Sequence, residues 1–204
     1  MAEPSLAYAP AIDVEPGIVH PTPDDSPGPL RLREKRHDCV QLAGFGAGRD
    51  LAAWLEETVG ACAAPGAAVP VLNQEALLLA TGPATWLLVA EPGRLAGFPP
   101  GPKDGLHAIA ALTDFSDGRS VAFELRGPAA AQVLAMHLGL DLDEAGFAPG
   151  RCAATGIHAM QVVVARREPD VFLVLVQRSF AASLWEILLD SALSYGAVVD
   201  PAAS

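Results

Sequence analysis

The stretch LTDFSDGRSVAFELRGP, residues 112–128, concentrates charged side chains that could do chemistry. Asp114 and Asp117 are carboxylates and Arg119 is a guanidinium within six positions, a combination that serves acid-base catalysis or the binding of a charged substrate. The same residues suit a structural ion pair, since ion-pair networks resemble functional sites. Because no nucleophile or base follows in a recognisable order, the pattern favours structural pairing over catalysis.

The dipeptide Asp117-Gly118 predicts a tight turn at the centre of this stretch. Asp-Gly supplies the positive φ angles of a two-residue type I′ turn between antiparallel strands. An apolar strand ends at Asp114, and the alternating run SVAFELR after the turn is typical of a half-buried strand. We therefore expect a hairpin in which Asp114 and Arg119 pair across the turn and fix the register, with Arg126 on the polar face of the second strand.

The three cysteines, Cys39, Cys62 and Cys152, lie far apart and form no CxxC pair. This spacing predicts neither a disulfide framework nor a zinc knuckle, so we expect buried free thiols. His158 would share a strand face with Cys152, but one imidazole and one thiol lack the further ligands that a zinc site needs. No metal-binding residue is assigned.

Other reactive residue types stand in patterns that favour structural roles. His37, Asp38 and Cys39 are adjacent, and a strand sends neighbours to opposite faces, which argues against joint action. Ser179 has no GxSxG motif around it and is predicted to cap a helix. No GxGxxG follows a strand and no GxxxxGK is present, so no phosphate-binding loop is expected. The sequence assigns no catalytic and no cofactor-binding residue to this chain.

Composition narrows the classes of partner. The net charge of -11 argues against nucleic acid, whose binding needs a surplus of Lys and Arg on one face. Mean hydropathy is +0.31, yet no apolar run approaches the roughly 20 residues of a membrane helix. The acidic, proline-containing N-terminus lacks the pattern of a secretory signal, so we expect a cytoplasmic protein. The excess of apolar residues indicates either a large Ala and Leu core or a surface covered by another chain.

The chain divides into a proline-rich N-terminal arm, residues 1–29, and one domain, residues 30–200. The arm contains seven prolines, a density predicted to exclude regular helix and sheet. Its scattered apolar residues leave two interpretations open: a mobile tail, or an extended segment that becomes ordered along a neighbouring surface.

The domain shows strand patterns separated by single helices. Strands are predicted in HDCVQLAG, in the hairpin pair EALLLA and ATWLLVA, in HAIAALTDFS and SVAFELRG, and in FAPGRCAATG, HAMQVVVARR and DVFLVLV. Helices are predicted in GRDLAAWLEETVGAC, after Gly127 and Pro128, and in SFAASLWEILLDSALSYG. This order predicts an α+β fold with helices packed on a mostly antiparallel sheet.

Four short motifs in the second half of the chain carry a family resemblance. They are D-x-S-D-G-R at 114–119, R-G-P-A-A at 126–130, F-A-P-G-R-C at 147–152 and R-S-F-A-x-S-L-W at 178–185. Each is modest by itself, but the ordered set resembles the gamma subunits of heterotetrameric sarcosine oxidase. The resemblance covers residues 108–196 and extends more weakly over residues 31–90.

The resemblance implies a fold related to the folate-binding aminomethyltransferases and a place beside alpha, beta and delta subunits. The complex would hold FAD, FMN, NAD and tetrahydrofolate. It would oxidise sarcosine to glycine, forming hydrogen peroxide and a one-carbon unit that passes to tetrahydrofolate or leaves as formaldehyde. The gamma chain is not known as the flavin carrier, so the resemblance implies an assembly or stabilising role, a chain that is not itself catalytic and no catalytic residue to carry over.

Three alternatives stay open at this point. A related complex could act on another N-methyl amino acid, such as N-methylglutamate, because substrate contacts would lie in the flavin subunit. A free-standing folate-binding, aminomethyltransferase-like protein would use Asp114 and Arg119 as pocket residues. An interaction module without any enzymatic context is the third.

Overall fold

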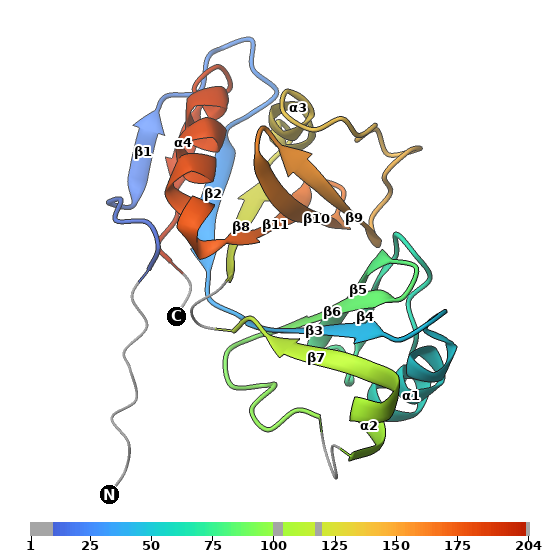
Figure 1. The fold of residues 1–204 in the computed structure, drawn as a ribbon. Helices are drawn as coiled ribbons and strands as arrows, with labels where there is room; N and C mark the ends of the chain where they lie inside the picture. Colours follow the sequence, from blue (N-terminus) through green and yellow to red (C-terminus); the bar gives the residue numbers. More distant parts are fainter. Residues whose placement is uncertain (1–9, 100–103, 117–119, 203–204) are drawn as a thin grey trace, which may run out of the picture.

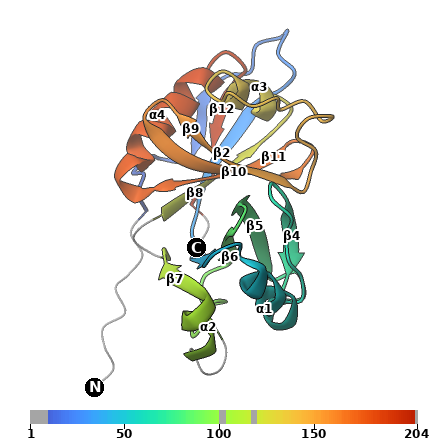
Figure 2. The same ribbon diagram turned by 45° about the vertical axis from the view of Figure 1, so that its right-hand side comes forward.

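Two β-sheets stacked face to face form the centre of the molecule, as a computed structural model shows (Figure 1). The structure describes residues 10–99, 104–116 and 120–202. Helices cover the outer face of each sheet, so the layers run helix, sheet, sheet, helix (Figure 2). The predicted α+β class with mostly antiparallel pairing is confirmed, but the strands form two sheets.

The first sheet has seven strands in the order β1-β12-β2-β8-β11-β10-β9, and its only parallel pair among the described residues is β12 with β2. The strands are β1 Gly17–His20, β2 Leu30–Lys35, β8 Ser120–Arg126, β9 Arg151–Ile157, β10 Met160–Glu168, β11 Val171–Gln177 and β12 Ala197–Val199. Its helices are α3 Ala130–Ala135 and α4 Ala181–Ala192, and a short 3-10 turn, η1 Arg178–Phe180, leads into α4.

The second sheet has five antiparallel strands in the order β4-β5-β6-β3-β7. The strands are β3 Asp38–Gly44, β4 Ala68–Val71, β5 Ala76–Gly82, β6 Thr85–Ala90 and β7 Ala110–Asp114, with helices α1 Arg49–Val59 and α2 Asp104–Ile109. The predicted β5-β6 hairpin and the predicted helix ending before Gly60, which takes φ +89, are confirmed.

Three apolar clusters hold the layers together. The first lies between the seven-stranded sheet and α3 and α4, and the second between the five-stranded sheet and α1 and α2. The third, here called the inter-sheet core, lies between the sheets and includes Cys39, Leu79, Cys152 and Leu173. The middle strands are buried on both faces, so the side chains on both faces leave water when the chain folds. Their sequences are therefore nearly continuous apolar runs.

The predicted hairpin around Asp117-Gly118 is wrong. β7 pairs with β3 in one sheet, whereas β8 pairs with β2 and β11 in the other, so the segment between them crosses from sheet to sheet. Asp117 and Arg119 lie outside the described residues. The Asp114 carboxylate accepts the Ser116 backbone N–H at 2.8 Å, and its predicted pairing with Arg119 stays a prediction. An Asp-Gly signal reports a local turn preference and carries no information about which sheet the next strand joins.

β8 alternates as predicted, but both of its faces are buried. Phe123 packs in the cluster beneath α4, at 5.4 Å between ring centroids from Trp185. On the opposite face Glu124 is only 6% exposed, and it accepts a hydrogen bond from Arg33 of β2 at 2.7 Å. The polar residues of β8 predicted that this face would be exposed, but the second sheet and Arg33 bury it.

Two further predictions about helices need correction. The run from His107 to Ile109, assigned to a strand, forms the end of α2, and the strand begins at Ala110. Ser179 is not an N-cap, because it lies inside η1 and α4 begins at Ala181. In both places a short helical turn comes first: α2 precedes β7, and η1 precedes α4. The periodicity of a few apolar residues does not distinguish such a turn from the strand or helix that follows it.

Much of the predicted arm belongs to the domain. Gly17–His20 forms the edge strand β1, paired with β12, so the prediction that the prolines exclude sheet is wrong there. Upstream, the buried carboxylate of Glu34 accepts the backbone N–H groups of Ala11 and Ile12 at 2.8 to 3.0 Å. Downstream, Ser26 donates its hydroxyl to the Tyr195 carbonyl at 2.8 Å. Residues 10–29 are therefore fixed on their own chain.

The Glu34 contact gives a test of this attachment. Glu34→Gln keeps one carbonyl oxygen but loses the charge that strengthens the bonds to residues 11 and 12, so we expect the free energy of unfolding to fall by about 1–2 kcal/mol. Glu15→Gln changes an exposed carboxylate and should stay within about 0.5 kcal/mol of the wild type. Urea denaturation measures both, and equal stability of all three proteins would contradict the attachment.

Candidate functional site

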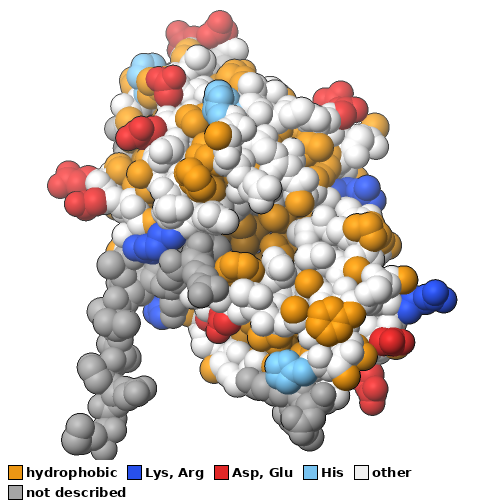
Figure 3. Space-filling model, in the orientation of Figure 1, with side chains coloured by type: hydrophobic (Ala, Val, Ile, Leu, Met, Phe, Trp, Pro, Cys, Tyr) orange, Lys and Arg blue, Asp and Glu red, His pale blue; other side chains and the backbone are white. Residues whose placement is uncertain are grey.

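A cleft of about 530 Å³ opens between the two sheets. Its walls come from β3, β5 and β6 on one side and from β9, β10 and β11 on the other. Figure 3 shows hydrophobic side chains inside the hollow between the two halves of the molecule. This volume lies within the usual range of small-molecule pockets, roughly 300–1,000 Å³.

The cleft has an apolar floor and a rim of neutral polar groups. The floor is formed by Cys39, Leu87, Phe115, Val163 and Leu175. The rim carries three amides and two hydroxyls, from Gln41, Gln161, Gln177, Thr81 and Thr155. None of these described side chains carries a charge, and amides and hydroxyls both donate and accept hydrogen bonds. The arrangement suits binding of a neutral group with an apolar body.

Strand geometry places these residues together. Cys39 and Gln41 of β3 are two positions apart, so they share the face that meets the other sheet. Gln161 and Val163 of β10 do the same from the opposite side. The period of two therefore sends one polar and one apolar side chain from each strand into the cleft.

A small hydrogen-bond network fixes the floor where Phe115 enters it. The Phe115 N–H donates to the Cys39 carbonyl at 2.7 Å, and the Cys39 N–H donates to Ser116 Oγ at 2.8 Å. Asp114 holds Ser116 through the bond described above. The D-x-S part of the opening motif thus ties the end of β7 to β3 and aims Phe115 into the cleft. Ser116 had no predicted role, although it lies within the motif.

Cys152 stands beside a second hollow of about 430 Å³, which shares Thr81 and Ala154 with the cleft. Its Sγ lies within hydrogen-bonding distance of two carbonyl oxygens, Ala67 at 3.1 Å and Ala80 at 3.6 Å, which share its single hydrogen. Burial raises the pKa of the Cys152 thiol to about 11. Because the thiolate is the reactive form, this thiol is inert near neutral pH. The predicted free cysteines are confirmed, and Cys62 is only partly buried.

The structure does not bring His158 to Cys152. His158 lies in the β9-β10 turn with φ +50 and is exposed, whereas Cys152 faces the inter-sheet core. The neighbour of His158 is His137, at 5.8 Å between ring centroids.

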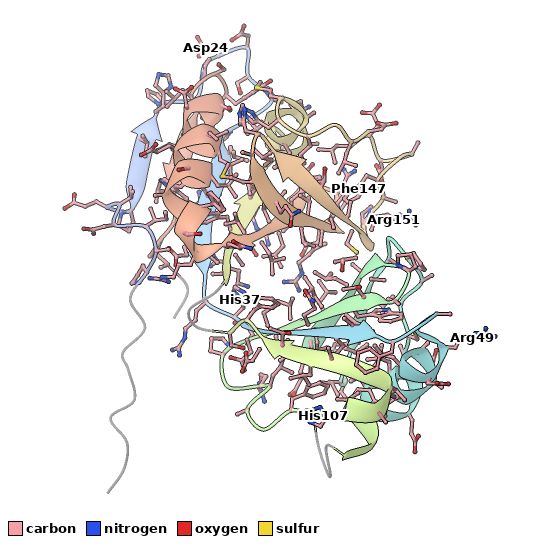
Figure 4. The ribbon with its side chains drawn as sticks, in the orientation of Figure 1. Asp24, His37, Arg49, His107, Phe147 and Arg151 are labelled. Carbon is pink, nitrogen blue, oxygen red and sulfur yellow. The ribbon has the colours of Figure 1, made fainter. Side chains whose placement is uncertain are left out.

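Other titratable or charged side chains lie away from the cleft. Figure 4 shows Arg49 and His107 at the outside of the lower half of the molecule. In the described residues no three His, Cys, Asp or Glu side chains are placed to share a metal ion.

His137 and Ser191 form a hydrogen-bonded pair. The residue types are those of a nucleophile and its general base, but the hydrogen bond runs in the opposite direction. The Ser191 hydroxyl donates to the Ile187 carbonyl at 2.8 Å, so its single hydrogen is already used. The His137 Nε2 at 2.7 Å must then donate to the Ser191 oxygen. The imidazole cannot accept a proton from that hydroxyl in this arrangement, and the pair joins α4 to the end of α3.

The His137 imidazole gives a pH prediction. Burial, and secondly the charge of His158, lower the pKa of His137 below its ordinary value. The unfolded chain therefore binds a proton more readily, and stability is lost as the pH falls below about 6.5 toward the lowered pKa. His158→Gln should raise the pKa of His137 in an NMR titration, whereas His107→Gln, on α2, should leave it unchanged. An unchanged pKa in the first variant would contradict this coupling.

Comparison with known proteins bears on the fold. No protein-family model matches the chain, and no curated protein matches it. A chain of the heterotetrameric sarcosine oxidase from Corynebacterium sp. U-96, in complex with pyrrole 2-carboxylate, superposes with a TM-score of 0.63 at 24% identity, over 81% of this chain and 85% of that one. The fold is shared.

A second solved structure matches over most of this chain. The glycine cleavage system aminomethyltransferase T from Bartonella henselae superposes with a TM-score of 0.59 at 18% identity, over 87% of this chain and 48% of that one. This chain therefore spans about half the length of that transferase. Both likenesses show the α+β fold that the sarcosine oxidase resemblance implied.

Proposed function

We propose that this chain is the small, non-flavin, gamma-type subunit of a heterotetrameric sarcosine oxidase, with an assembly or stabilising role. The observation that carries the proposal is the matched extent of the fold, 81% of this chain on 85% of a chain from such a complex. The four ordered motifs between residues 114 and 185 support it as well. In the proposed complex, the alpha, beta and delta chains hold the cofactors and oxidise sarcosine to glycine.

The chemistry of the cleft agrees with a chain that leaves catalysis to its partners. Neutral amides and hydroxyls can orient a ligand or a partner side chain, but they cannot transfer the protons of an oxidation. The loop between β3 and α1 also differs from a dinucleotide-binding loop of the βαβ type. The glycine-containing loop between β3 and α1 follows a strand whose neighbours, β6 and β7, are both antiparallel. A dinucleotide site of the βαβ type requires a parallel strand there.

The open alternatives differ in what this chain should bind. A complex acting on N-methylglutamate would use the same small subunit, since substrate contacts lie in the flavin chain. A free-standing tetrahydrofolate-binding protein could place a planar ring in the cleft. It would need cations for the two carboxylates of the glutamate tail, and none of the described lining residues is cationic.

Removing the chain from the cells that make it tests the proposal. A deletion strain should lose sarcosine-dependent hydrogen peroxide formation in its lysate, and a plasmid copy of this chain should restore it. Loss of activity toward N-methylglutamate instead would favour the related complex. Full sarcosine activity without the chain would overturn the proposal, and tight tetrahydrofolate binding by the purified chain would support the free-standing alternative.

A further inference from the structure

The two sheets present four edges, and three of them carry features that hinder an added strand. β1 lies between Pro16 and Pro21 and has a register shift against β12. β4 contains Pro70, and the N–H of Ala68 donates outward to the Gly150 carbonyl at 2.8 Å. β9 is closed at its beginning, where the Cys152 N–H donates to the Gly66 carbonyl at 2.9 Å. Proline, irregular register and bridging loops are the usual protections of an exposed edge.

Within the part of the chain that the structure describes, β7 shows none of these protections. Its sequence AALTD contains no proline and no lysine, and its register with β3 runs without a shift from Ala110 to Asp114. Among the described residues, β3 is the only strand paired with β7. Figures 1 and 2 show β7 along the outside of the lower sheet.

The hydrogen-bond pattern identifies which backbone groups face outward. Phe115 donates to the Cys39 carbonyl, and Phe45 donates to the Ile109 carbonyl at 2.8 Å. In an antiparallel pair, bonded positions alternate, so positions 111 and 113 also bond to β3. The N–H and C=O groups of Leu112 and Asp114 therefore point away from β3 to the open edge.

The inner face of β7 lies beside the cleft. Ala111 and Thr113 lie on the side of β7 that faces the other sheet, and Thr113 is in register with Gln41 of the cleft rim. Ala111 is nevertheless exposed and Thr113 is only partly buried. The seven-stranded sheet thus leaves the inner face of β7 uncovered, next to an apolar hollow.

We propose that β7 is a docking edge for an extended strand of a larger partner chain, which adds to the five-stranded sheet and turns side chains toward the cleft. This inference rests on the proposed function, since the partner is one of the larger chains of the oxidase. A second copy fits less well, because two chains of net charge -11 repel each other. A partner strand with Lys or Arg opposite the exposed carboxylate of Asp114 complements that charge.

One substitution removes an outward donor and leaves the pairing with β3 in place. Leu112→Pro deletes the outward N–H, and proline is tolerated at an edge position whose N–H faces solvent. Leu112→Ala is the matched control, because it shortens the same side chain and keeps the N–H. Leu112→Pro should weaken partner binding by about tenfold or more relative to Leu112→Ala, with thermal melts showing that both are folded.

Amide hydrogen exchange completes the test, on the tagged chain purified alone and in the complex from the cells that make it. In the free chain, Leu112 and Asp114 should exchange fast, and Thr113 and Phe115 slowly. In the complex, Leu112 and Asp114 should slow by about tenfold or more. A complex in which these two amides exchange as in the free chain overturns the inference and leaves the proposed function standing. Failure to find any complex overturns both, and a self-associated chain with the same amides protected assigns the edge to a second copy.

Discussion

An Arg166→Met variant is expected to lose about 3–5 kcal/mol of unfolding free energy. Arg166 on β10 is only 5% exposed. Its guanidinium donates to the Pro169 carbonyl at 3.0 and 2.6 Å, and to the carbonyls of Leu142 and Phe147 at 3.1 and 2.9 Å. It also lies 5.1 Å from the ring centroid of Phe172. Methionine matches part of the volume but leaves these buried acceptors without their donor.

The neighbouring residue supplies the control for this prediction. Arg167 is exposed on the same strand, so Arg167→Met removes a similar charge without touching the buried carbonyls. We expect it to change stability by less than about 0.5 kcal/mol. Guanidinium chloride denaturation compares the two variants, and similar losses in both would show that charge, and not the buried hydrogen bonds, sets the effect.

Gly127→Ala is expected to cost about 2–4 kcal/mol. Gly127 has φ +135, a backbone conformation that L-residues with a side chain rarely adopt, and an added Cβ would clash with the Pro29 carbonyl oxygen. Backbone strain of this kind costs about 1–3 kcal/mol, and the close contact with a backbone atom adds to it. Pro29 directly precedes β2, so relieving the contact must move the start of a central strand.

Gly139→Ala is the matched variant for this glycine. Its added Cβ meets no atom within 4 Å, and its φ is not in the positive range. The substitution should be neutral or slightly stabilising, because alanine restricts the unfolded chain. Thermal unfolding of both variants tests the argument. Equal melting temperatures for the two variants would contradict it.

The parts of the fold that follow from local pattern could be predicted from the sequence. The β5-β6 hairpin, the three-strand run from β9 to β11 and helices α1 and α4 each place their apolar residues at the matching period. The division into two sheets could not, because it depends on pairings between distant segments. Glu124 illustrates this. Its polar side chain indicated a solvent-exposed face, but in the folded chain it pairs with Arg33 of the neighbouring strand β2.

The candidate site was hidden for the same reason. Gln41, Gln161 and Gln177 come from three strands and form no local motif, so only the folded sheets bring them to one rim. Phe115 and Ser116 lie within the motif at residues 114–119, but their roles depend on β3, which lies far upstream in the sequence.

Native mass spectrometry of the tagged chain, purified without denaturation from the cells that make it and with its absorbance spectrum recorded first, tests the central claim most directly. The subunit account predicts a particle much heavier than the 21.1 kDa chain, which contains larger chains and has the absorbance of bound flavin. A colourless particle of 21.1 kDa would contradict it.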